Sequence, residues 1–341
     1  MATKWGILSA SKISHDFVLA LEKLSTEDHK VVAVAAKDIS RAKDFADEFG
    51  ISTYYGSYEE LGNDSNVDVV YIGALNHQHY SLTKLMLESC KPVLCEKPFC
   101  INAKQLDELI KLSNAKKLFL MEAMWSRFTP AYQKVIEVLQ NGTIGTVLHV
   151  QVNFGRQMSN IERIWKKEVG GGSILDIGVY TLHLVDTILG PDKPVFIESK
   201  GTLNSHGTDE NMSAILEYPE GKIAVISIHT KVEMDCSAYI HGTKGTIKIH
   251  EPFHASNKVT VNTTNNDTSC YTFVQPDTRK PTIFPNSVQL RYEIDHVRHC
   301  LKKGFIESPV VTLNNSYTVQ EIMDRLRNQI GVHFEDYDTS P

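Results

Sequence analysis

The sequence predicts an α/β protein with an N-terminal Rossmann-type, doubly wound parallel sheet and a C-terminal α+β half that contains a large, mostly antiparallel open sheet. Strand and helix patterns alternate through the first third of the chain, which is typical of βαβ units. After about Ala123 several strand patterns follow one another with short connections, which indicates antiparallel pairing. The 341 residues fit two domains at roughly 150 residues each. We place these domains at residues 1–123 and 124–341.

Five buried strands separated by helices are expected in the first domain. Val31–Ala36 is almost wholly apolar, as a parallel strand covered on both faces should be. Gly50 ends the helix that follows it. The predicted strands are Lys4–Leu8, Val31–Ala36, Val67–Ile72, Pro92–Cys95 and Leu118–Glu122. The predicted helices are Ile13–Leu24, Ala42–Phe49, His77–Ser89 and Ala103–Ala115.

The second domain is expected to place helices against one face of its sheet. Turn signals such as Pro219-Glu220-Gly221 separate the strands. The polar stretch Asn262–Ser269 is interpreted as a flexible loop tip. The predicted strands are Val147–Phe154, Pro194–Leu203, Asn211–Tyr218, Lys222–Lys231, Cys236–His241, Thr246–His250 and Lys258–Thr263. The predicted helices are Pro130–Leu139, one starting at Gly170, Ser287–Lys303 and Ser316–Ile330.

Composition and charge exclude several classes of protein. Lys+Arg 35 against Asp+Glu 41 gives a net charge of −6, so no basic surface for nucleic acid is expected. No run approaches the roughly 18 apolar residues of a membrane span, and the N-terminus does not resemble a secretion signal. Six cysteines without a C-x-x-C pair are typical of a reduced, cytoplasmic protein. No His or Cys group has metal-ligand spacing, so no metal is expected.

The turn after the first strand is a candidate phosphate-binding site. Doubly wound sheets bind dinucleotides beyond the carboxyl ends of their strands, with the pyrophosphate at the N-terminus of the first helix. Only Gly6 remains of the usual glycine fingerprint, but Ser9, Ala10 and Ser11 are small enough for a phosphate to approach closely. An ordinary strand-to-helix turn is the alternative interpretation.

Basic residues follow the second strand, where an NAD-preferring site usually carries an acidic residue that binds the ribose. Lys37 ends the strand, and Arg41 lies four residues further on. Two cations would pair well with the extra phosphate of NADP, so we favour NADP over NAD. Asp38 leaves an alternative open, because it could cap the next helix or bind a ribose hydroxyl. The cations could also be ordinary solvated charges.

Two further motifs carry groups suited to proton transfer. Glu96-Lys97-Pro98 directly follows a strand, which places Lys97 at the strand's carboxyl end, although a lone lysine can also be a plain surface cation. The segment from Gly170 to His183 contains three glycines and Ser173, which could cap a helix. Asp176 and Tyr180 are four residues apart and share a helix face, with His183 near it. Tyr180 could alternatively be a core aromatic residue.

These motifs occur in the order found in the Gfo/Idh/MocA oxidoreductase family, which the chain resembles over nearly its whole length. The segments concerned are the Gly6 turn, Ala74–His79, Glu96-Lys97-Pro98 and the GGGSILDIGVY segment. The Met121–Phe128 stretch and Tyr180, where many relatives carry His, are similar to one branch of that family. That branch implies NADP-dependent oxidation of a hydroxyl of trans-1,2-dihydrobenzene-1,2-diol to give catechol, of D-xylose to give D-xylonolactone, or of both.

The resemblance also implies the roles of individual residues. Lys97 and Tyr180 would act on the substrate hydroxyl, supported by Asp176. The implied NADP contacts are Gly6, Leu8, Ser9, Ala10, Ser11, Lys12, Ile13, Lys37, Arg41, Ala74, Asn76, His79, Glu96 and Lys97. Two departures stand out: Ser9 and Ser11 replace glycines common in relatives, and Lys37 replaces an arginine, which keeps the charge but loses its planar fork.

Aromatic side chains supply candidates for the substrate pocket, because both flat diols and sugar rings pack on aromatic faces. The candidates are Trp125, Phe154, His183 and Phe284, with His254 in addition. Each could equally be a core residue.

The expected reaction is hydride transfer to the nicotinamide, with loss of the hydroxyl proton from the substrate. A free tyrosine has a pKa of about 10, and a nearby ammonium group favours its ionised form. Lys97 beside Tyr180 would therefore form a coupled acid/base unit.

Two other functions remain open. One is a dehydrogenase of inositol or another sugar, for which His would be expected at position 180. The other is a non-catalytic sensor of dinucleotides, which would need none of Lys97, Asp176 and Tyr180. A sheet with one face free of helices also predicts a homodimer through the C-terminal sheet.

Overall fold

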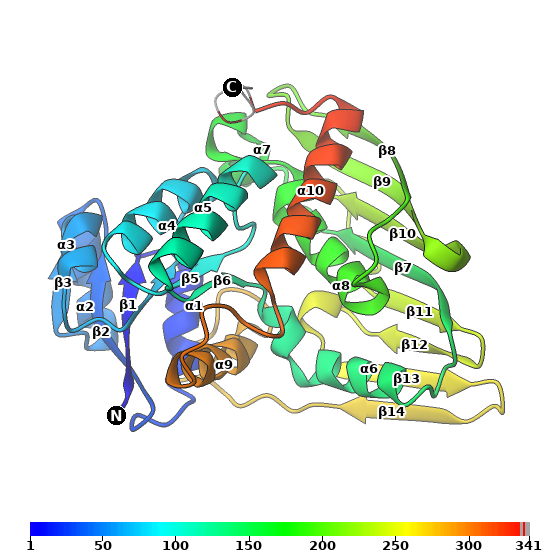
Figure 1. Cartoon of the computed structure of the whole chain (residues 1–341), viewed down its shortest axis with the longest axis horizontal. Coiled ribbons are helices and arrows are strands. Elements are labelled where there is room, and N and C mark those ends of the chain that lie inside the picture. Colours follow the sequence, from blue (N-terminus) through cyan, green and yellow to red (C-terminus); the bar gives the residue numbers. More distant parts are fainter. Residues whose placement is uncertain (335–336, 338–341) are drawn as a thin grey trace. The chain divides into compact units, whose positions relative to one another are not determined.

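Two compact units make up the part of the chain described by the structure, a computed structural model that covers residues 1–334 and 337 (Figure 1). Unit 1 consists of Met1–Cys100, Lys104–Trp125 and Gln275–Asn314. Unit 2 consists of Ile101–Ala103, Ser126–Val274 and the described residues from Asn315 onward. The units differ from the predicted domains 1–123 and 124–341 chiefly because Gln275–Asn314 belongs to unit 1. Residues 335, 336 and 338–341 of the predicted second domain lie outside the described residues.

A six-stranded parallel sheet forms the centre of unit 1, with the strand order β3-β2-β1-β4-β5-β6, which confirms the predicted doubly wound sheet. Its strands β4, β5 and β6 are buried at every position, as the apolar runs predicted. The strands are β1 (Thr3–Leu8), β2 (His29–Ala35), β3 (Thr53–Tyr55), β4 (Val69–Ile72), β5 (Val93–Glu96) and β6 (Leu120–Ala123). The helices between them are α1 (Lys12–Leu21), α2 (Ile39–Phe49), α3 (Tyr58–Asn63), α4 (His79–Glu88) and α5 (Ala103–Lys116), the last beginning at a residue of unit 2.

Two short elements of unit 1, β3 and α3, were not predicted. The three residues of β3 are too few to show a period. Helix α3 begins with a capping box, in which Ser57 Oγ accepts the N–H of Glu60 and the Glu60 carboxylate accepts the N–H of Ser57. The Ser-x-x-Glu pattern in the sequence could have revealed this helix.

The segment Gln275–Asn314 joins unit 1 through helix α9 (Leu290–Lys302), which packs against α1. The Arg298 guanidinium donates hydrogen bonds to the Thr3 hydroxyl (3.0 Å) and pairs with Asp28. The N–H of Leu120 donates to the Ile306 carbonyl (3.1 Å), so the chain beyond α9 also bonds to the edge strand β6. These contacts join residues that are between 186 and 295 positions apart, which explains why local patterns did not predict them.

An eight-stranded sheet forms unit 2, with the order β14-β13-β12-β11-β7-β10-β9-β8. The neighbouring strands β7 and β10 are parallel and every other pair is antiparallel, which confirms the predicted, mostly antiparallel sheet. The strands are β7 (Val147–Gly155), β8 (Phe196–Leu203), β9 (Asp209–Tyr218), β10 (Lys222–His229), β11 (Ala238–Gly242), β12 (Gly245–Ile249), β13 (Lys258–Thr263) and β14 (Thr268–Thr272).

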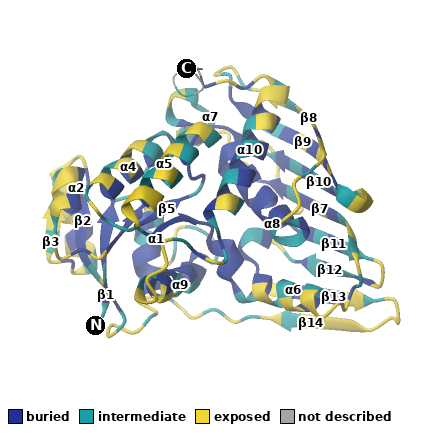
Figure 2. Ribbon diagram, in the orientation of Figure 1, coloured by how far each residue is buried: buried dark blue, intermediate teal, exposed yellow. Residues whose placement is uncertain are grey.

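Helices cover one face of this sheet. Buried and more exposed residues alternate along β9, β10 and β12, as expected when a single face is covered. Helix α8 (Val179–Leu189) packs on β7 and β10 and is almost wholly buried (Figure 2). Helix α6 (Pro130–Gln140) packs on β13. From α10 (Leu313–Ile330), Gln329 Nε2 donates to the Ile197 carbonyl of β8 (2.8 Å).

The structure corrects two predictions in unit 2. Asn262–Ser269 is not a loop tip throughout, because its ends lie in the paired strands β13 and β14. The helix predicted to start at Gly170 begins at Ile174 with a wide, π-type turn, Ile174–Gly178, that leads into α8. Ser173 does not cap this helix with its side chain. The Asp209 carboxylate does so, accepting hydrogen bonds from Ser173 Oγ and from the N–H of Ile174, both at 2.6 Å.

One helical stretch, Lys167–Leu189, is long and apolar enough to cross a membrane by composition alone. Because 89% of its most apolar window is buried inside the protein, we interpret it as a core helix.

Candidate active site

The turn after β1 closes tightly on the first turn of α1. Ser9 has the left-handed backbone conformation, with a φ of 82°, which glycine adopts far more easily than serine. Its carbonyl accepts the Ser14 hydroxyl at 2.7 Å, and its N–H donates to the Ala35 carbonyl at 2.9 Å. Ser11 caps the helix by accepting the N–H of Ser14. The turn thus places the N-terminus of α1, a site that favours anions, at the carboxyl edge of the sheet.

A close approach between strand and helix accompanies this turn. Gly73 follows β4, and its N–H donates to the Leu8 carbonyl at 3.1 Å. A Cβ atom on Gly73 would lie 2.4 Å from the Ser14 hydroxyl oxygen, so only glycine permits this packing. Lys12 and Ile13 are the first residues of α1, and Ala10 precedes its cap.

Asp38 caps the helix that follows β2. Its Oδ1 accepts the N–H of Ser40 at 2.9 Å and the Ser40 hydroxyl at 2.8 Å, and these hydrogen bonds lower the pKa of the carboxyl. Arg41 donates from Nη2 to the Ala10 carbonyl at 2.8 Å. This hydrogen bond connects α2 to the turn after β1, the candidate phosphate-binding turn (hereafter the phosphate turn). Lys37 and Arg41 are both exposed. Of the two roles open to Asp38, the structure shows the capping role.

The Glu96–Lys97 motif lies at the carboxyl end of β5 as predicted. The Tyr71 hydroxyl donates to Glu96 Oε1 at 2.7 Å, and the backbone N–H of Lys97 donates to Glu96 Oε2 at 3.2 Å. Burial raises the pKa of Glu96 to about 7, and these two hydrogen bonds and the Lys97 charge act against that rise. Glu96 is therefore buried and bonded to the backbone of Lys97, and its contact with NADP stays a prediction.

His79 joins two of the predicted segments. Its ring nitrogens lie 2.7 Å from the Pro98 carbonyl oxygen and 3.1 Å from that of Ala74. Asn76 begins the short helical turn Asn76–Gln78 between them. Burial lowers the pKa of His79, and the two backbone carbonyls act against that fall. The two carbonyl contacts fix the Ala74–His79 loop against the residues around Lys97.

Asp176 and Tyr180 lie where helix α8 of unit 2 begins. Asp176 lies in the π-type turn, Tyr180 lies in the first turn of α8, and both are buried. Asp176 Oδ1 accepts a hydrogen bond from Arg163 Nη1 at 2.6 Å, in an ion pair. Arg163 comes from α7 (Glu162–Trp165), and the sequence analysis did not select it. Its position two residues before Trp165 and near the glycine run carries no local signal for this pairing.

An aromatic cluster surrounds Tyr180 in unit 2. The rings of Tyr180 and His254 have centroids 4.8 Å apart, and His254 stacks on Phe154 at 4.6 Å with an interplanar angle of 16°. Phe253 meets Phe154 edge-on at 5.6 Å. The structure thus brings together Tyr180 and two of the predicted pocket residues, Phe154 and His254. His183, also predicted, is buried in α8.

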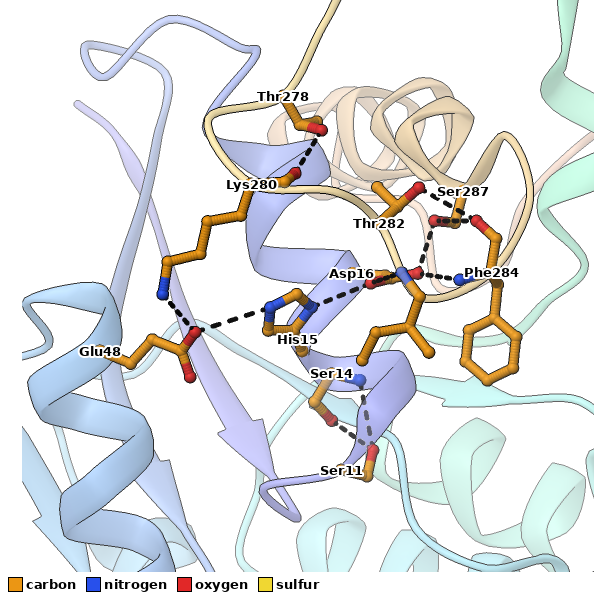
Figure 3. Close-up of polar contacts among 11 residues, drawn as sticks. Ser11, Ser14, His15, Asp16, Glu48, Thr278, Lys280, Thr282, Phe284 and Ser287 are labelled. Atoms are coloured by element: carbon orange, nitrogen blue, oxygen red, sulfur yellow. Dashed lines mark hydrogen bonds and ion pairs between the residues drawn. The ribbon is translucent and has the colours of Figure 1, made fainter.

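The other two predicted pocket residues belong to unit 1. Trp125 is almost fully buried, and Phe284 is half-buried. Phe284 lies on an irregular segment held against α1 by Asp16 (Figure 3). The Asp16 carboxylate accepts the N–H groups of Ile283 (2.9 Å) and Phe284 (2.8 Å) and the Ser287 hydroxyl (2.6 Å). Nearby, Lys280 and His15 both approach the Glu48 carboxylate.

Family models match most of the chain. A model described as "Oxidoreductase family, NAD-binding Rossmann fold" matches residues 3–124, and one described as "GFO/IDH/MocA C-terminal domain" matches residues 132–248. The chain belongs to the GFO/IDH/MocA oxidoreductase family. Accordingly it is an oxidoreductase with a nicotinamide cofactor.

Within this GFO/IDH/MocA family, a relative named trans-1,2-dihydrobenzene-1,2-diol dehydrogenase from Xenopus tropicalis is 42% identical over 98% of this chain and 100% of its own length. Among solved structures, a 3-ketoreductase from Actinomadura kijaniata in complex with NADP and TDP-benzene has a TM-score of 0.81 at 22% identity, covering 97% of this chain and 98% of that chain. Levoglucosan dehydrogenase with NADH and levoglucosan has a TM-score of 0.84 at 16% identity, covering 97% and 98%. These two structures share the fold.

The first unit of this GFO/IDH/MocA protein fits a dinucleotide. The left-handed Ser9 turn, the capped start of α1 and the close approach at Gly73 form the tight strand-to-helix connection that pyrophosphate binding requires. Within residues 1–334 and 337, no group of three or more His, Cys, Asp or Glu residues could hold a metal ion.

Proposed function

We propose that this protein oxidises trans-1,2-dihydrobenzene-1,2-diol to catechol with NADP as the hydride acceptor, and that D-xylose is a second substrate, oxidised to D-xylonolactone. The proposal rests on the 42% identity with a dihydrodiol dehydrogenase over nearly the full length of both chains. The retained Lys97, Asp176 and Tyr180 support it, because a protein that only binds a dinucleotide needs no proton-transfer groups.

NADP supplies the hydride acceptor when it is bound. Tyr180 takes the proton of the substrate hydroxyl, and the ammonium group of Lys97 favours the ionised phenol. Asp176, held by Arg163, orients the acid/base group. The rings of Phe154 and His254 beside Tyr180 give the flat substrate ring an aromatic surface.

The preference for NADP over NAD rests on the end of β2. Lys37 and Arg41 are exposed there, whereas the Asp38 carboxylate already accepts two hydrogen bonds from Ser40. Two cations beside a carboxylate that already accepts hydrogen bonds suit the ribose of NADP, which carries a phosphate. The ribose of NAD, which has a free pair of hydroxyls, would fit this arrangement less well.

A single assay separates this function from the alternatives. NADPH absorbance is followed with purified protein and, in turn, the trans-dihydrodiol, D-xylose and myo-inositol, each with NADP and with NAD. We expect turnover with the diol and D-xylose and a preference for NADP. Turnover with inositol alone would instead indicate a different sugar dehydrogenase. Tight NADPH binding without turnover of any substrate would indicate a sensor.

We also propose a homodimer through the face of the C-terminal sheet opposite α8. That face exposes Ser213, Ile215 and Glu217 of β9, while the intervening residues are buried. Light scattering at micromolar concentration should give the mass of two chains, and a monomer mass would contradict the proposal. The cysteine pattern favours a cytoplasmic location, which cell fractionation tests.

A further inference from the structure

The Arg163–Asp176 ion pair lies beside the proposed proton acceptor. Arg163 Nη1 donates to Asp176 Oδ1 at 2.6 Å, and Asp176 is buried while Arg163 is partly exposed. The Asp176 carboxylate raises the pKa of the Arg163 guanidinium above its usual range, and Tyr180 acts in the same direction. Arg163 is thus in direct contact with a carboxylate that lies one helical turn before Tyr180.

This coupling is reciprocal. If an ionised Tyr180 stabilises the charged guanidinium, the guanidinium stabilises the ionised Tyr180 by the same free energy. Asp176 has the opposite effect, because its negative charge lies one helical turn before the phenol. The pair together is close to neutral, so Arg163 offsets a carboxylate that would otherwise oppose the loss of the tyrosine proton.

Close backbone packing positions the Arg163–Asp176 ion pair. A Cβ atom on Gly171 would lie 2.6 Å from the carbonyl oxygens of Ile164 and Lys166, so the glycine run lets the α7 segment approach the start of the π-type turn. The N–H of Gly172 donates to the Ile164 carbonyl at 2.7 Å, which fixes that approach. The neighbour of Ile164 on this segment, Arg163, is thereby held opposite Asp176.

We propose that Arg163 is a positioning residue that sets the acidity of Tyr180, both by holding Asp176 and by cancelling its charge. The inference rests on the proposed role of Tyr180 as proton acceptor. Arg163 and Asp176 add two opposite charges to the surroundings of a phenol that also has the His254 ring beside it and, in the proposed mechanism, the Lys97 ammonium. Removing the cation disfavours the ionised phenol, removing the anion favours it, and removing both nearly restores the balance.

The ionisation of Tyr180 tests this balance without any substrate. The full-length protein is labelled with carbon-13 at the ζ position of tyrosine, and the Tyr180 signal is assigned by its loss in Tyr180→Phe. Its titration is then followed by NMR in the wild type, Arg163→Met, Asp176→Asn and the double variant. We expect the midpoint to rise by at least about one pH unit in Arg163→Met and to fall in Asp176→Asn. In the double variant it should return close to the wild-type value.

A matched control separates this effect from a general loss of charge. Lys166 lies on the same segment but pairs with Glu162 at the surface, so Lys166→Met should leave the Tyr180 midpoint unchanged. Arg163→Lys should restore most of the shift. An unchanged midpoint in a folded Arg163→Met, or a double variant shifted as far as Arg163→Met, would overturn the proposal. If Arg163→Met does not fold, a midpoint that fails to fall in Asp176→Asn overturns it.

Kinetics then distinguish this proposal from the proposed function. If the diol is turned over, Arg163→Met should lower kcat about tenfold on the acidic side of the pH profile, with little change in NADPH affinity. Opposite midpoint shifts in the two single variants, combined with no turnover of diol or D-xylose by the wild type, would confirm the charge balance and contradict the proposed substrates.

Discussion

Glu96 and Tyr71 share a 2.7 Å hydrogen bond at the carboxyl end of β5, where Lys97 is the next residue in the chain. A second buried acid, Glu293 of α9, lies near them and is fully excluded from solvent. Among the residues that the structure describes, neither Glu293 carboxylate oxygen has a hydrogen-bond partner. Burial and the Glu96 charge raise the pKa of Glu293 well above its usual value, which favours the protonated acid in the folded protein.

The contribution of Glu293 to the stability of the protein should therefore become less favourable as the pH rises. A carboxyl whose folded pKa is raised binds more protons in the folded state, so it opposes folding above the unfolded pKa of about 4.3. The penalty is about tenfold in the folding constant for each pH unit until the folded pKa is reached. We expect Glu293→Gln to stabilise the protein at pH 8 but not at pH 4. Urea unfolding at both pH values measures this, and equal effects at the two would contradict it.

Ser9→Gly should stabilise the phosphate turn. The left-handed backbone costs serine about 1–2 kcal/mol. Glycine relieves this strain, but its unfolded chain has more conformational entropy to lose on folding, which offsets up to about 1 kcal/mol of the gain. The expected net gain is about 0.5–1 kcal/mol in the free energy of unfolding. Ser11→Gly is the matched control, because Ser11 has an ordinary extended backbone and caps α1, so its loss should cost a few tenths of a kcal/mol. Effects of the same sign in both variants would refute the strain at Ser9.

The choice of coenzyme should depend on Lys37 and Arg41. Replacing both with Met should weaken NADPH binding at least about tenfold and leave NADH binding nearly unchanged, because only NADPH carries the extra phosphate. Lys43→Met is the control, since Lys43 lies on the same helix but pairs with Asp47. Calorimetric titration of both coenzymes measures the ratio. An equal loss of affinity for NADPH and NADH would show that the two cations do not recognise the extra phosphate of NADPH.

Tyr180→Phe and Lys97→Met test the proposed proton transfer. Both variants should lose at least about a hundredfold in kcat, the usual contribution of a general acid or base. Tyr180→Phe should keep its NADPH affinity, because the lost hydroxyl acts on the substrate. Steady-state rates with the diol and NADPH fluorescence titration measure the two effects. Full turnover in Tyr180→Phe would remove that residue from the mechanism.

Asp16 should be essential for holding the Phe284 segment. Its carboxylate accepts two N–H groups and one hydroxyl. Asp16→Ala leaves the two N–H groups without their acceptor, while the Ser287 hydroxyl keeps the Phe284 carbonyl at 3.0 Å, and the change should cost about 2–4 kcal/mol of stability. Asp47→Ala, an exposed ion-pair partner on α2, should cost less than about 1 kcal/mol. Hydrogen exchange should accelerate at the amides of Ile283 and Phe284. Unchanged exchange there would show that other contacts hold the segment.

Local patterns predicted most of the fold because its strands are strongly apolar or alternate regularly. The position of Lys97 at the end of β5 followed from the strand pattern. The shared helix face of Asp176 and Tyr180 stays a prediction, because a π-type turn leads into α8 between them. What local patterns missed depends on contacts between distant residues. Asp209 caps a helix that begins 35 residues before it, and Arg163 reaches across a glycine run to Asp176. Strand β14, which begins at Thr268, was missed because its sequence is mostly polar.

The return of Gln275–Asn314 to unit 1 has a consequence for synthesis on the ribosome. The dinucleotide-binding unit lacks α9, and the backbone partners of Asp16, until almost the entire polypeptide has been made. A truncated product ending near residue 125 would leave the α9-facing side of α1 uncovered and Arg298 absent from Thr3. In a nascent chain, unit 1 therefore stays incomplete while the whole sheet of unit 2 is synthesised. The two units cannot complete their folding strictly one after the other.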